Sequence, residues 1–254
     1  MHLPPVGLGT MGIGDPDVVE TAIDLGYRHL DTAQIYDNER VVGDGLAASD
    51  VPREDLTVAT KLWIDSLAGG DVRPGTEASL DRLGLDSVDL LYVHRPRGDY
   101  DPESTLPAVD AVHDAGLATH VGLSNFEPDQ LERARELLDA PIAAHQVEFH
   151  PYFGDPDLLA DAQEHDYPLV AYSPLIGGDA FDDSVLTDIA EGHDTSPAAV
   201  SIAWVLAHEN VVTIPKASSR EHLRANLEAQ HLNLSDEEVA RIDAIDRERE
   251  LYPE

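Results

Sequence analysis

Short apolar runs rich in Val, Ile and Leu recur along the chain, and longer stretches of mixed polarity separate them. Runs of this length bounded by Gly, Pro and Asp predict buried strands, whereas apolar residues spaced three or four apart predict helices. The predicted strands cover residues 5–8, 27–30, 56–60, 88–93, 118–123, 144–149, 168–172 and 211–215. Because helical stretches alternate with these strands, the pattern predicts an α/β protein built as a (β/α)8 TIM barrel.

Capping residues support several of the predicted helices. Asp15 followed by Pro16 predicts where the first helix begins, because Asp caps the first turn and Pro is tolerated at the first helical position. Ser235 and Glu238 have the spacing of a capping box and predict the start of the last helix. Helices are predicted over 104–115, 127–138 and 235–247. The Gly- and Asp-rich stretch 179–195 predicts a loop or a small extra element, and without a linker we expect residues 1–254 to form a single domain.

The composition limits the classes of function. Asp and Glu number 50 against 16 Lys and Arg, and the formal net charge of -34 argues against binding to nucleic acid or an anionic membrane. Hydrophobic residues make up 42% of the chain, enough for a sizeable core. The absence of cysteine excludes disulfides, thiolate nucleophiles and Cys-ligated zinc. Because we find no secretory signal pattern and no apolar run of roughly 18 residues, we expect a cytoplasmic protein.

Lysine is nearly absent, and its positions are informative. Only Lys61 and Lys216 occur, and each ends a short apolar run, LTVATK or VVTIPK. An Asp-rich, Lys-poor chain resembles proteins of organisms with a salt-loaded cytoplasm, where concentrated salt screens self-repulsion. We therefore favour a halophilic protein over a merely acidic mesophilic one. Both lysines are candidates for function, because the ends of barrel strands are where catalytic residues lie.

Residues 7–12 read GLGTMG and match the glycine pattern of a dinucleotide-binding Rossmann fold. The surrounding sequence argues against that interpretation. The strand before the glycines would contain Pro4 and Pro5, which disfavour strand pairing. The helix would have to begin within the glycines, whereas Asp15 and Pro16 place its start later. We therefore favour the barrel over a Rossmann domain.

Polar residues lie at or just beyond the ends of predicted strands, namely Asp31, Tyr36, Lys61 and His94. The C-terminal ends of barrel strands meet at one mouth, so these residues are expected to converge although they are distant in sequence. Their types suit proton transfer to a carbonyl oxygen. A tyrosine titrates near pH 10, and a neighbouring ammonium is expected to lower that pKa. A carboxylate would hold the ammonium in place, and an imidazole would orient the carbonyl.

Several motifs resemble those of the aldo-keto reductase family. In chain order they are GLGTMG, YRHLDTAQIYDNE, VATKLW, DLLYVH, VGLSNF, HQVEFHP, AYSPL and VTIPK, from residue 7 to residue 216. The resemblance implies a (β/α)8 barrel that binds a nicotinamide cofactor without a Rossmann fold and reduces an aldehyde or ketone, in a short, prokaryotic-type member. It makes Tyr36 the proton donor and His94 the group that orients the carbonyl. Lys61, paired with Asp31, would tune the pKa of the tyrosine.

The resemblance also implies which residues contact the cofactor and the substrate. The cofactor contacts are Thr10, Met11, Asp31, Ser124, Asn125, Gln146, Tyr172, Ser173, Pro174, Leu175, Lys216, Ser218, Ser219, His222 and Asn226. The substrate contacts are Trp63, His94 and Arg95. At the adenosine end Lys216 keeps one cation, whereas His222 stands where the family has an arginine. We therefore favour NADP(H) as the cofactor, with NAD(H) as the alternative.

Arg95 departs from the family pattern, which has tryptophan at this position. The guanidinium adds a cation near the substrate, which favours an acidic or hydroxylated substrate. Alternatively, Arg95 pairs with a surface carboxylate. We expect a small-molecule carbonyl substrate, no nucleic-acid or membrane partner, and a monomer.

Other interpretations remain open from the sequence alone. A barrel lysine could form a Schiff base with a carbonyl substrate, which would make the chain an aldolase. The chain could also be a regulatory or scaffold subunit that binds the cofactor with little turnover. His145, Glu148 and His150 raise the question of a metal, but only Glu148 and His150 share a face of a strand. Because no third ligand is evident, we expect no metal site.

Overall fold

The computed structural model describes residues 1–253, and within them the strands form one closed parallel sheet. The strands are β1 (Leu8–Gly9), β2 (His29–Asp31), β3 (Thr57–Leu62), β4 (Val88–Val93), β5 (Ala118–Ser124), β6 (Ile142–Glu148), β7 (Leu169–Tyr172) and β8 (Val211–Thr213). Each strand pairs with the next one in sequence order. Backbone hydrogen bonds from Gly7 N to Thr213 O (2.8 Å) and from Thr213 N to Pro5 O (2.9 Å) close the ring. The predicted (β/α)8 barrel is confirmed.

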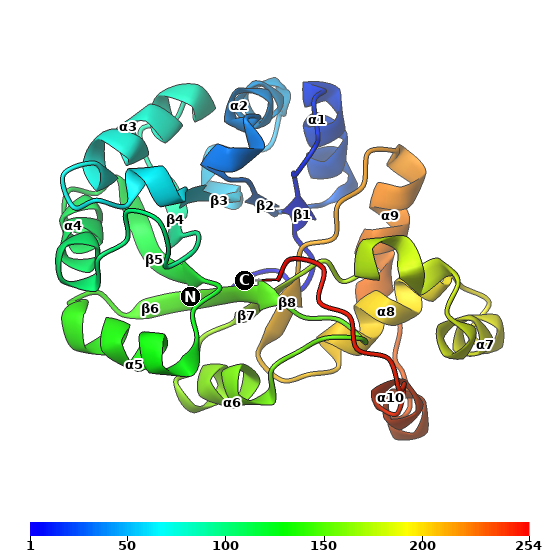
Figure 1. Ribbon diagram of the computed structural model, residues 1–254. Coiled ribbons are helices and arrows are strands. Elements are labelled where there is room, and N and C mark those ends of the chain that lie inside the picture. The colour runs from blue at the N-terminus through cyan, green and yellow to red at the C-terminus, as the bar shows by residue number, and fades with distance from the viewer. Residues whose placement is uncertain (254) are drawn as a thin grey trace.

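Helices surround the strands (Figure 1). They are α1 (Pro16–Leu25), α2 (Glu39–Ala48), α3 (Val72–Leu83), α4 (Pro102–Asp114), α5 (Pro128–Leu137), α6 (Pro156–Glu164), α7 (Ser184–Gly192), α8 (Pro197–Leu206), α9 (Arg220–Glu228) and α10 (Asp236–Asp243). Short 3-10 turns lie at η1 (Gln34–Tyr36), η2 (Arg53–Asp55), η3 (Ile64–Ser66), η4 (Ile176–Phe181) and η5 (Ala229–His231). In residues 1–253 no helix combines the length and the apolar character needed to cross a membrane.

The predicted capping residues begin their helices as expected. The Asp15 carboxylate accepts a hydrogen bond from Asp17 N at 3.1 Å, and Pro16 is the first residue of α1. The Ser235 hydroxyl accepts a hydrogen bond from Glu238 N at 3.3 Å, while Ser235 N donates to the Glu238 carboxylate at 2.8 Å. These bonds satisfy backbone donors that the first helical turn leaves unpaired. The two helix starts predicted from capping are therefore confirmed.

Some predicted boundaries are wrong. Tyr27 was expected to begin a strand, but its backbone N–H donates to Ala22 O at 3.0 Å, in the turn that ends α1. Its hydroxyl donates to Leu223 O at 2.9 Å and so links the end of α1 to α9. Strand β2 begins two residues later, at His29. The last helix ends at Asp243 rather than at residue 247. The stretch 179–195, predicted as a loop or a small extra element, does contain such an element, the short helix α7, in which Leu186 and Ile189 recur at helical spacing and are buried.

The glycines of residues 7–12 do not begin a Rossmann unit. They include β1, and α1 starts only at Pro16. The sheet also lacks the reversal of strand order that defines a doubly wound fold, since the described strands run in sequence order. The sequence-based preference for the barrel is therefore confirmed.

Alternation along the strands decides which side chains point into the barrel. A small inner core contains Leu3, Ala59, Leu90, Tyr92, Ala143, Ala144, Val170, Val212 and Ile214. Side chains two residues apart share a face, so Lys61 follows Ala59 into the barrel and Gln146 follows Ala144. A larger apolar core lies between the strands and the helices. The inner core thus ends in polar side chains at the C-terminal mouth of the barrel.

The C-terminal tail after α10 runs back toward the mouth of the barrel (red in Figure 1). Arg247 and Arg249 both form ion pairs with Asp179, in the loop after β7. Further along, Tyr252 N donates to the carboxylate of Glu148 at 3.1 Å. The tail is therefore tied both to β6 and to the loop after β7, and it carries Tyr252 to the mouth.

Candidate active site

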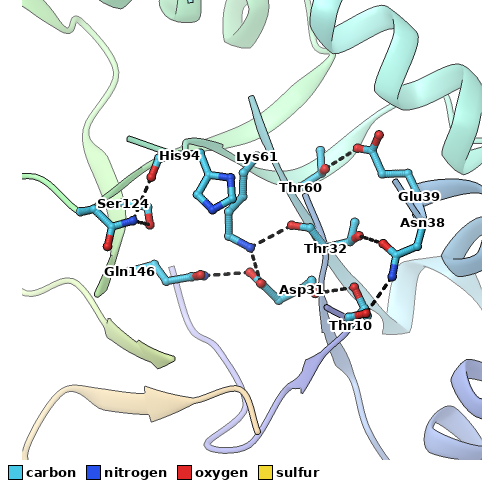
Figure 2. A network of polar contacts seen from close by, with 11 residues as sticks. Thr10, Asp31, Thr32, Asn38, Glu39, Thr60, Lys61, His94, Ser124 and Gln146 are labelled. Carbon is cyan, nitrogen blue, oxygen red and sulfur yellow. Dashed lines mark hydrogen bonds and ion pairs between the residues drawn. The ribbon is translucent and has the colours of Figure 1, made fainter. Parts of the chain in front are cut away.

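A buried ion pair lies at the mouth of the barrel, where β2 and β3 end. The side chain of Lys61 is 0% exposed and that of Asp31 is 1% exposed. The Lys61 ammonium donates hydrogen bonds to the Asp31 carboxylate and, at 2.9 Å, to Thr32 O. Gln146 on β6 donates to the other carboxylate oxygen of Asp31 at 2.8 Å, and Figure 2 shows these side chains meeting. Hydrogen bonds to both oxygens compensate for burying the charges.

Next to this ion pair lies a row of three aromatic rings, those of Tyr36, His94 and Trp63. Tyr36 ends η1, and the Lys61 ammonium lies 5.1 Å from the centre of its ring. His94, directly after β4, contacts Tyr36 edge-on with 5.9 Å between ring centroids. The Trp63 ring lies 5.0 Å from that of His94 in a similar arrangement. The structure thus brings together the four residues predicted to be catalytic.

A second polar network holds the segment that follows Tyr36, and the sequence analysis missed it. Asn38 is buried and donates to Thr10 O at 2.7 Å, while its side-chain oxygen accepts from the Thr32 hydroxyl at 3.0 Å. Glu39 is also buried and accepts from the hydroxyl of Thr60, the residue before Lys61, at 2.5 Å. These bonds tie the segment after η1 to β3 and to the residues that directly follow β1 and β2. The only sequence signal was the polar run after Tyr36, which by itself is as typical of an exposed turn.

The environment determines the protonation of the central groups. Burial alone lowers the pKa of Lys61, but Asp31 and Tyr36 together outweigh burial and raise it, so the ammonium stays charged. Burial, and then the charges of Lys61 and Arg95, lower the pKa of His94 well below its ordinary value. At neutral pH the site therefore presents an ammonium and a neutral imidazole.

The pKa of Tyr36 differs from the expectation. Burial raises it, and the nearby Lys61 charge lowers it only in part, while the Asp31 carboxylate adds a further upward contribution. The expected net lowering is therefore wrong for the structure described, although Lys61 acts in the predicted direction. Tyr36 is consequently a neutral phenol that carries its proton at physiological pH.

A cavity of about 680 Å³ opens beside these residues. The predicted residues in its wall are Thr10, Met11, Asp31, Tyr36, Trp63, His94, Arg95, Asn125, Gln146, Tyr172, Ser173, Pro174, Leu175 and Lys216. Among the described residues, the large apolar side chains left exposed are Met11, Ile35, Phe181 and Tyr252, and all of them line this cavity. A concave apolar wall with convergent polar groups is typical of a small-molecule site.

Comparison with known proteins identifies the family. Residues 5–247 match the sequence profile of the aldo/keto reductase family. The chain belongs to this family. It is 38% identical to the methylglyoxal reductase DkgB of Escherichia coli O157:H7, covering 100% of this chain and 97% of the relative. It is 35% identical to the glyoxal reductase of Bacillus subtilis strain 168, covering 100% and 92% of the two chains.

A solved structure agrees in fold. The crystal structure of a putative 2,5-diketo-D-gluconic acid reductase B superposes on this aldo/keto reductase with a TM-score of 0.94 and 34% identity. The match covers 99% of this chain and 91% of the other. The (β/α)8 barrel and the oxidoreductase class therefore rest on sequence and on structure together.

Three of the predicted cofactor contacts, Ser124, Asn125 and Tyr172, are joined by hydrogen bonds in this aldo/keto reductase. Asn125 has a left-handed backbone with φ 58°, and its amide donates to His94 O and to Ser124 Oγ, both at 3.0 Å. The Tyr172 hydroxyl donates to the Asn125 side-chain oxygen at 2.9 Å. Ser124 is buried and lies outside the wall of the cavity.

The residues predicted at the adenosine end lie on the segment between β8 and α9 and on α9 itself, and Lys216 alone among them lines the cavity. Ser218, Ser219 and His222 are exposed, and the Ser219 hydroxyl caps α9 by accepting from His222 N at 3.2 Å. Asn226 is buried in α9, and its side-chain nitrogen has no hydrogen-bond partner within residues 1–253. A buried donor without a partner is rare in proteins, and a bound ligand is one of the ways in which it is satisfied.

Three residues in the wall of the cavity had no sequence signal. Ile35 and Phe181 lie on η1 and η4, and Tyr252 comes from the C-terminal tail, where it contacts Tyr172 edge-on at 5.9 Å. None of them belongs to an apolar run long enough to predict a strand or a helix face. They reach the cavity only because separate loops converge at the mouth.

The possible metal ligands have other partners. The Glu148 carboxylate is 2.8 Å from His150 Nε2 and accepts backbone hydrogen bonds from the C-terminal tail. His145 Nε2 accepts from Phe126 N at 3.3 Å. Over residues 1–253 we find no group of three side chains suited to hold a metal ion.

Proposed function

We propose that this aldo/keto reductase reduces small aldehydes or ketones to alcohols with NADP(H), and that Tyr36 is the proton donor. The observation that carries the proposal is the neutral Tyr36 phenol, held beside a buried, charged Lys61 and a neutral His94 in the wall of a ligand-sized cavity. The relatives named for methylglyoxal and glyoxal make these small dicarbonyls the first substrates to test.

The described residues account for the proton transfer. A bound nicotinamide cofactor would supply the hydride. The carbonyl oxygen lies between Tyr36 and His94, where the neutral imidazole donates a hydrogen bond and orients it. Tyr36 Oη then passes its proton to that oxygen as negative charge develops. The Lys61 ammonium stabilises the resulting tyrosinate, and Asp31 keeps the ammonium in place.

The residues present fit a phosphorylated dinucleotide. The unsatisfied amide of the buried Asn226 marks one polar contact on α9. Lys216 adds a cation at the wall of the cavity, and Ser218 and Ser219 precede the first turn of α9, whose backbone donors favour anions. His222 is exposed and adds positive charge only when protonated. The retained lysine supports NADP(H) over NAD(H).

A Schiff-base aldolase is not supported. Its lysine must attack as a neutral amine, whereas Asp31 and Tyr36 raise the pKa of Lys61 and Asp31 holds its ammonium by a hydrogen bond. Lys216 is exposed rather than enclosed in an apolar pocket. A subunit that binds the cofactor with little turnover would have no need for the buried ion pair beside Tyr36.

The test compares wild type with Tyr36→Phe. NADPH and NADH oxidation is followed at 340 nm in 2 M KCl with methylglyoxal, glyoxal and a wider carbonyl panel. Because the phenol is the proton donor, we expect kcat to fall about 10²- to 10⁴-fold in the variant, while NADPH still binds by fluorescence. Turnover that survives in Tyr36→Phe would refute the assigned role. NADPH binding without turnover of any carbonyl by wild type would favour the regulatory subunit instead.

A further inference from the structure

A buried carboxylate at the mouth of the barrel takes no part in the proposed proton transfer. Glu148 is the last residue of β6 and is 5% exposed. It lies two residues beyond Gln146 on the same face of the strand, and in the parallel register it pairs with Tyr172. Gln146 and Tyr172 line the cavity, whereas Glu148 does not. A carboxylate buried so close to the site needs hydrogen-bond donors, and the C-terminal tail supplies them.

Three N–H groups converge on the carboxylate of Glu148. Leu251 N donates to one oxygen at 2.7 Å, and Tyr252 N donates to the other at 3.1 Å. His150 Nε2 lies 2.8 Å from the first oxygen, and His150 Nδ1 accepts from Tyr152 N at 3.2 Å. Because Nδ1 accepts, Nε2 carries the ring proton and donates to the carboxylate. Hydrogen bonds to a carboxylate are stronger than those between neutral groups, so both oxygens hold the tail.

Two further ties of the tail are exposed ion pairs. Arg247 and Arg249 both pair with Asp179, and the two arginine side chains are 49% and 43% exposed. Concentrated salt screens ion pairs at the surface, whereas it screens the buried bonds to Glu148 much less. In the concentrated salt expected from the composition, Glu148 is therefore the main anchor of residues 251 and 252.

The anchored segment carries Tyr252 into the wall of the cavity. Its ring contacts that of Tyr172 edge-on, with 5.9 Å between the centroids. Burial is the largest cause of the raised pKa of Tyr36, and Tyr252 is among the groups that add to it, so the two phenols lie close together. The Tyr252 side chain nevertheless remains exposed. An exposed aromatic ring beside the proposed proton donor is available to contact a substrate.

We propose that Glu148 is a positioning residue, which holds the Tyr252 ring in the wall of the substrate site by binding the backbone N–H groups of Leu251 and Tyr252. The ring then contacts the apolar group that the substrate carries beside its carbonyl. This inference rests on the proposed reductase function and adds the residues that select that group. Ile35 and Phe181 are exposed apolar residues that line the same cavity, which favours an aromatic group there.

The first measurement follows the tail itself, without substrate. Amide hydrogen exchange of the C-terminal peptide is followed by mass spectrometry in 2 M KCl for wild type, Glu148→Gln and the control Glu248→Gln. Glutamine keeps the size of Glu148 but loses the charge and one acceptor oxygen. We therefore expect the amides of Leu251 and Tyr252 to exchange at least about tenfold faster in that variant. Glu248 is exposed on the same tail, so its variant should match wild type within about twofold.

The second measurement uses two dicarbonyls that differ in the group beside the ketone, which is phenyl in phenylglyoxal and methyl in methylglyoxal. For Tyr252→Ala we expect KM for phenylglyoxal to rise about 3- to 10-fold, because an aromatic contact is lost. KM for methylglyoxal and both kcat values should stay within about threefold of wild type, because Tyr36 and His94 are unchanged. Tyr252→Phe keeps the ring and should behave like wild type.

A double variant shows whether Glu148 acts through Tyr252. Glu148→Gln alone should raise KM selectively for phenylglyoxal, as Tyr252→Ala does. If the carboxylate acts only by holding the ring, Glu148→Gln adds nothing once the ring is gone, so the double variant should match Tyr252→Ala. Circular dichroism checks that each variant is folded. If Glu148→Gln does not fold, Glu148→Asp replaces it, because its shorter carboxylate keeps the charge but reaches the tail less well.

Several results overturn the inference. If the two increases in KM add in the double variant, Glu148 acts by a route other than Tyr252. If exchange at the tail is unchanged in Glu148→Gln, or is equally fast in Asp179→Asn, the carboxylate is not the main anchor. If wild type reduces neither dicarbonyl nor the wider panel, the proposed function itself fails, while hydrogen exchange still decides whether Glu148 holds the tail.

Discussion

Replacing Lys61 by methionine tests how the buried ion pair is held together. The methionine chain fills much of the same space but cannot pair with Asp31, whose side chain is 1% exposed. Asp31 would keep its hydrogen bond from Gln146 at 2.8 Å and lose the ammonium. Thr32 O would lose its 2.9 Å partner as well. The variant therefore leaves a buried carboxylate without a counter-charge.

The expected magnitude follows from this burial. Breaking a buried pair by removing one partner costs about 3–5 kcal/mol, because an uncompensated charge remains in the core. Lys61→Met should lower the free energy of unfolding by about that amount. Asp31→Asn in the same background removes the stranded charge, so the double variant should recover at least about 2 kcal/mol of the loss. The pKa of Lys61 is raised, so its contribution is fully present below pH 10.5 and is lost only as pH rises through the higher folded value.

The measurement is urea unfolding in 2 M KCl at pH 7.5, followed by circular dichroism, for wild type, both single variants and the double variant. Lys216→Met is the matched control, because this second lysine is exposed and should change stability by less than about 0.5 kcal/mol. The reasoning is refuted if the losses of unfolding free energy in the two single variants sum, within about 0.5 kcal/mol, to the loss in the double variant. An equal loss in Lys216→Met would show that lysine removal destabilises the chain by another route.

Two further predictions concern charge and pH. His29 is fully buried and its ring nitrogens have no partner within residues 1–253, and burial lowers its pKa to about 4. Because the unfolded chain then binds a proton more strongly at this histidine, the free energy of unfolding should fall by up to about 3 kcal/mol between pH 6.5 and 4. In the His29→Leu variant, the free energy measured by urea unfolding should fall less over the same pH range. Because salt screens the repulsion within a chain of charge -34, the melting temperature should rise from 0.1 to 2 M KCl. A melting temperature that does not change with salt would contradict the halophilic interpretation.

The candidate site was predictable where residue type and strand position coincided. Asp31, Lys61 and His94 each end or directly follow an apolar run, and the strands of a barrel end at one mouth, so their convergence follows from the repeat. The pKa of Tyr36 was not predictable in the same way. The sequence identifies a neighbouring cation but contains no measure of burial, and burial has the larger effect.

The sequence by itself determined the number and order of the β–α units, the helix starts at capping residues and the convergence of Asp31, Lys61 and His94. These depend on local periodicity and on short-range hydrogen bonds, which the chain encodes in neighbouring residues. Only the tertiary structure decided that Tyr252 closes one side of the cavity and that Asn38 secures the segment after Tyr36. Such contacts join residues that are distant in sequence or depend on burial, and they form only when the packed barrel brings separate loops to one mouth.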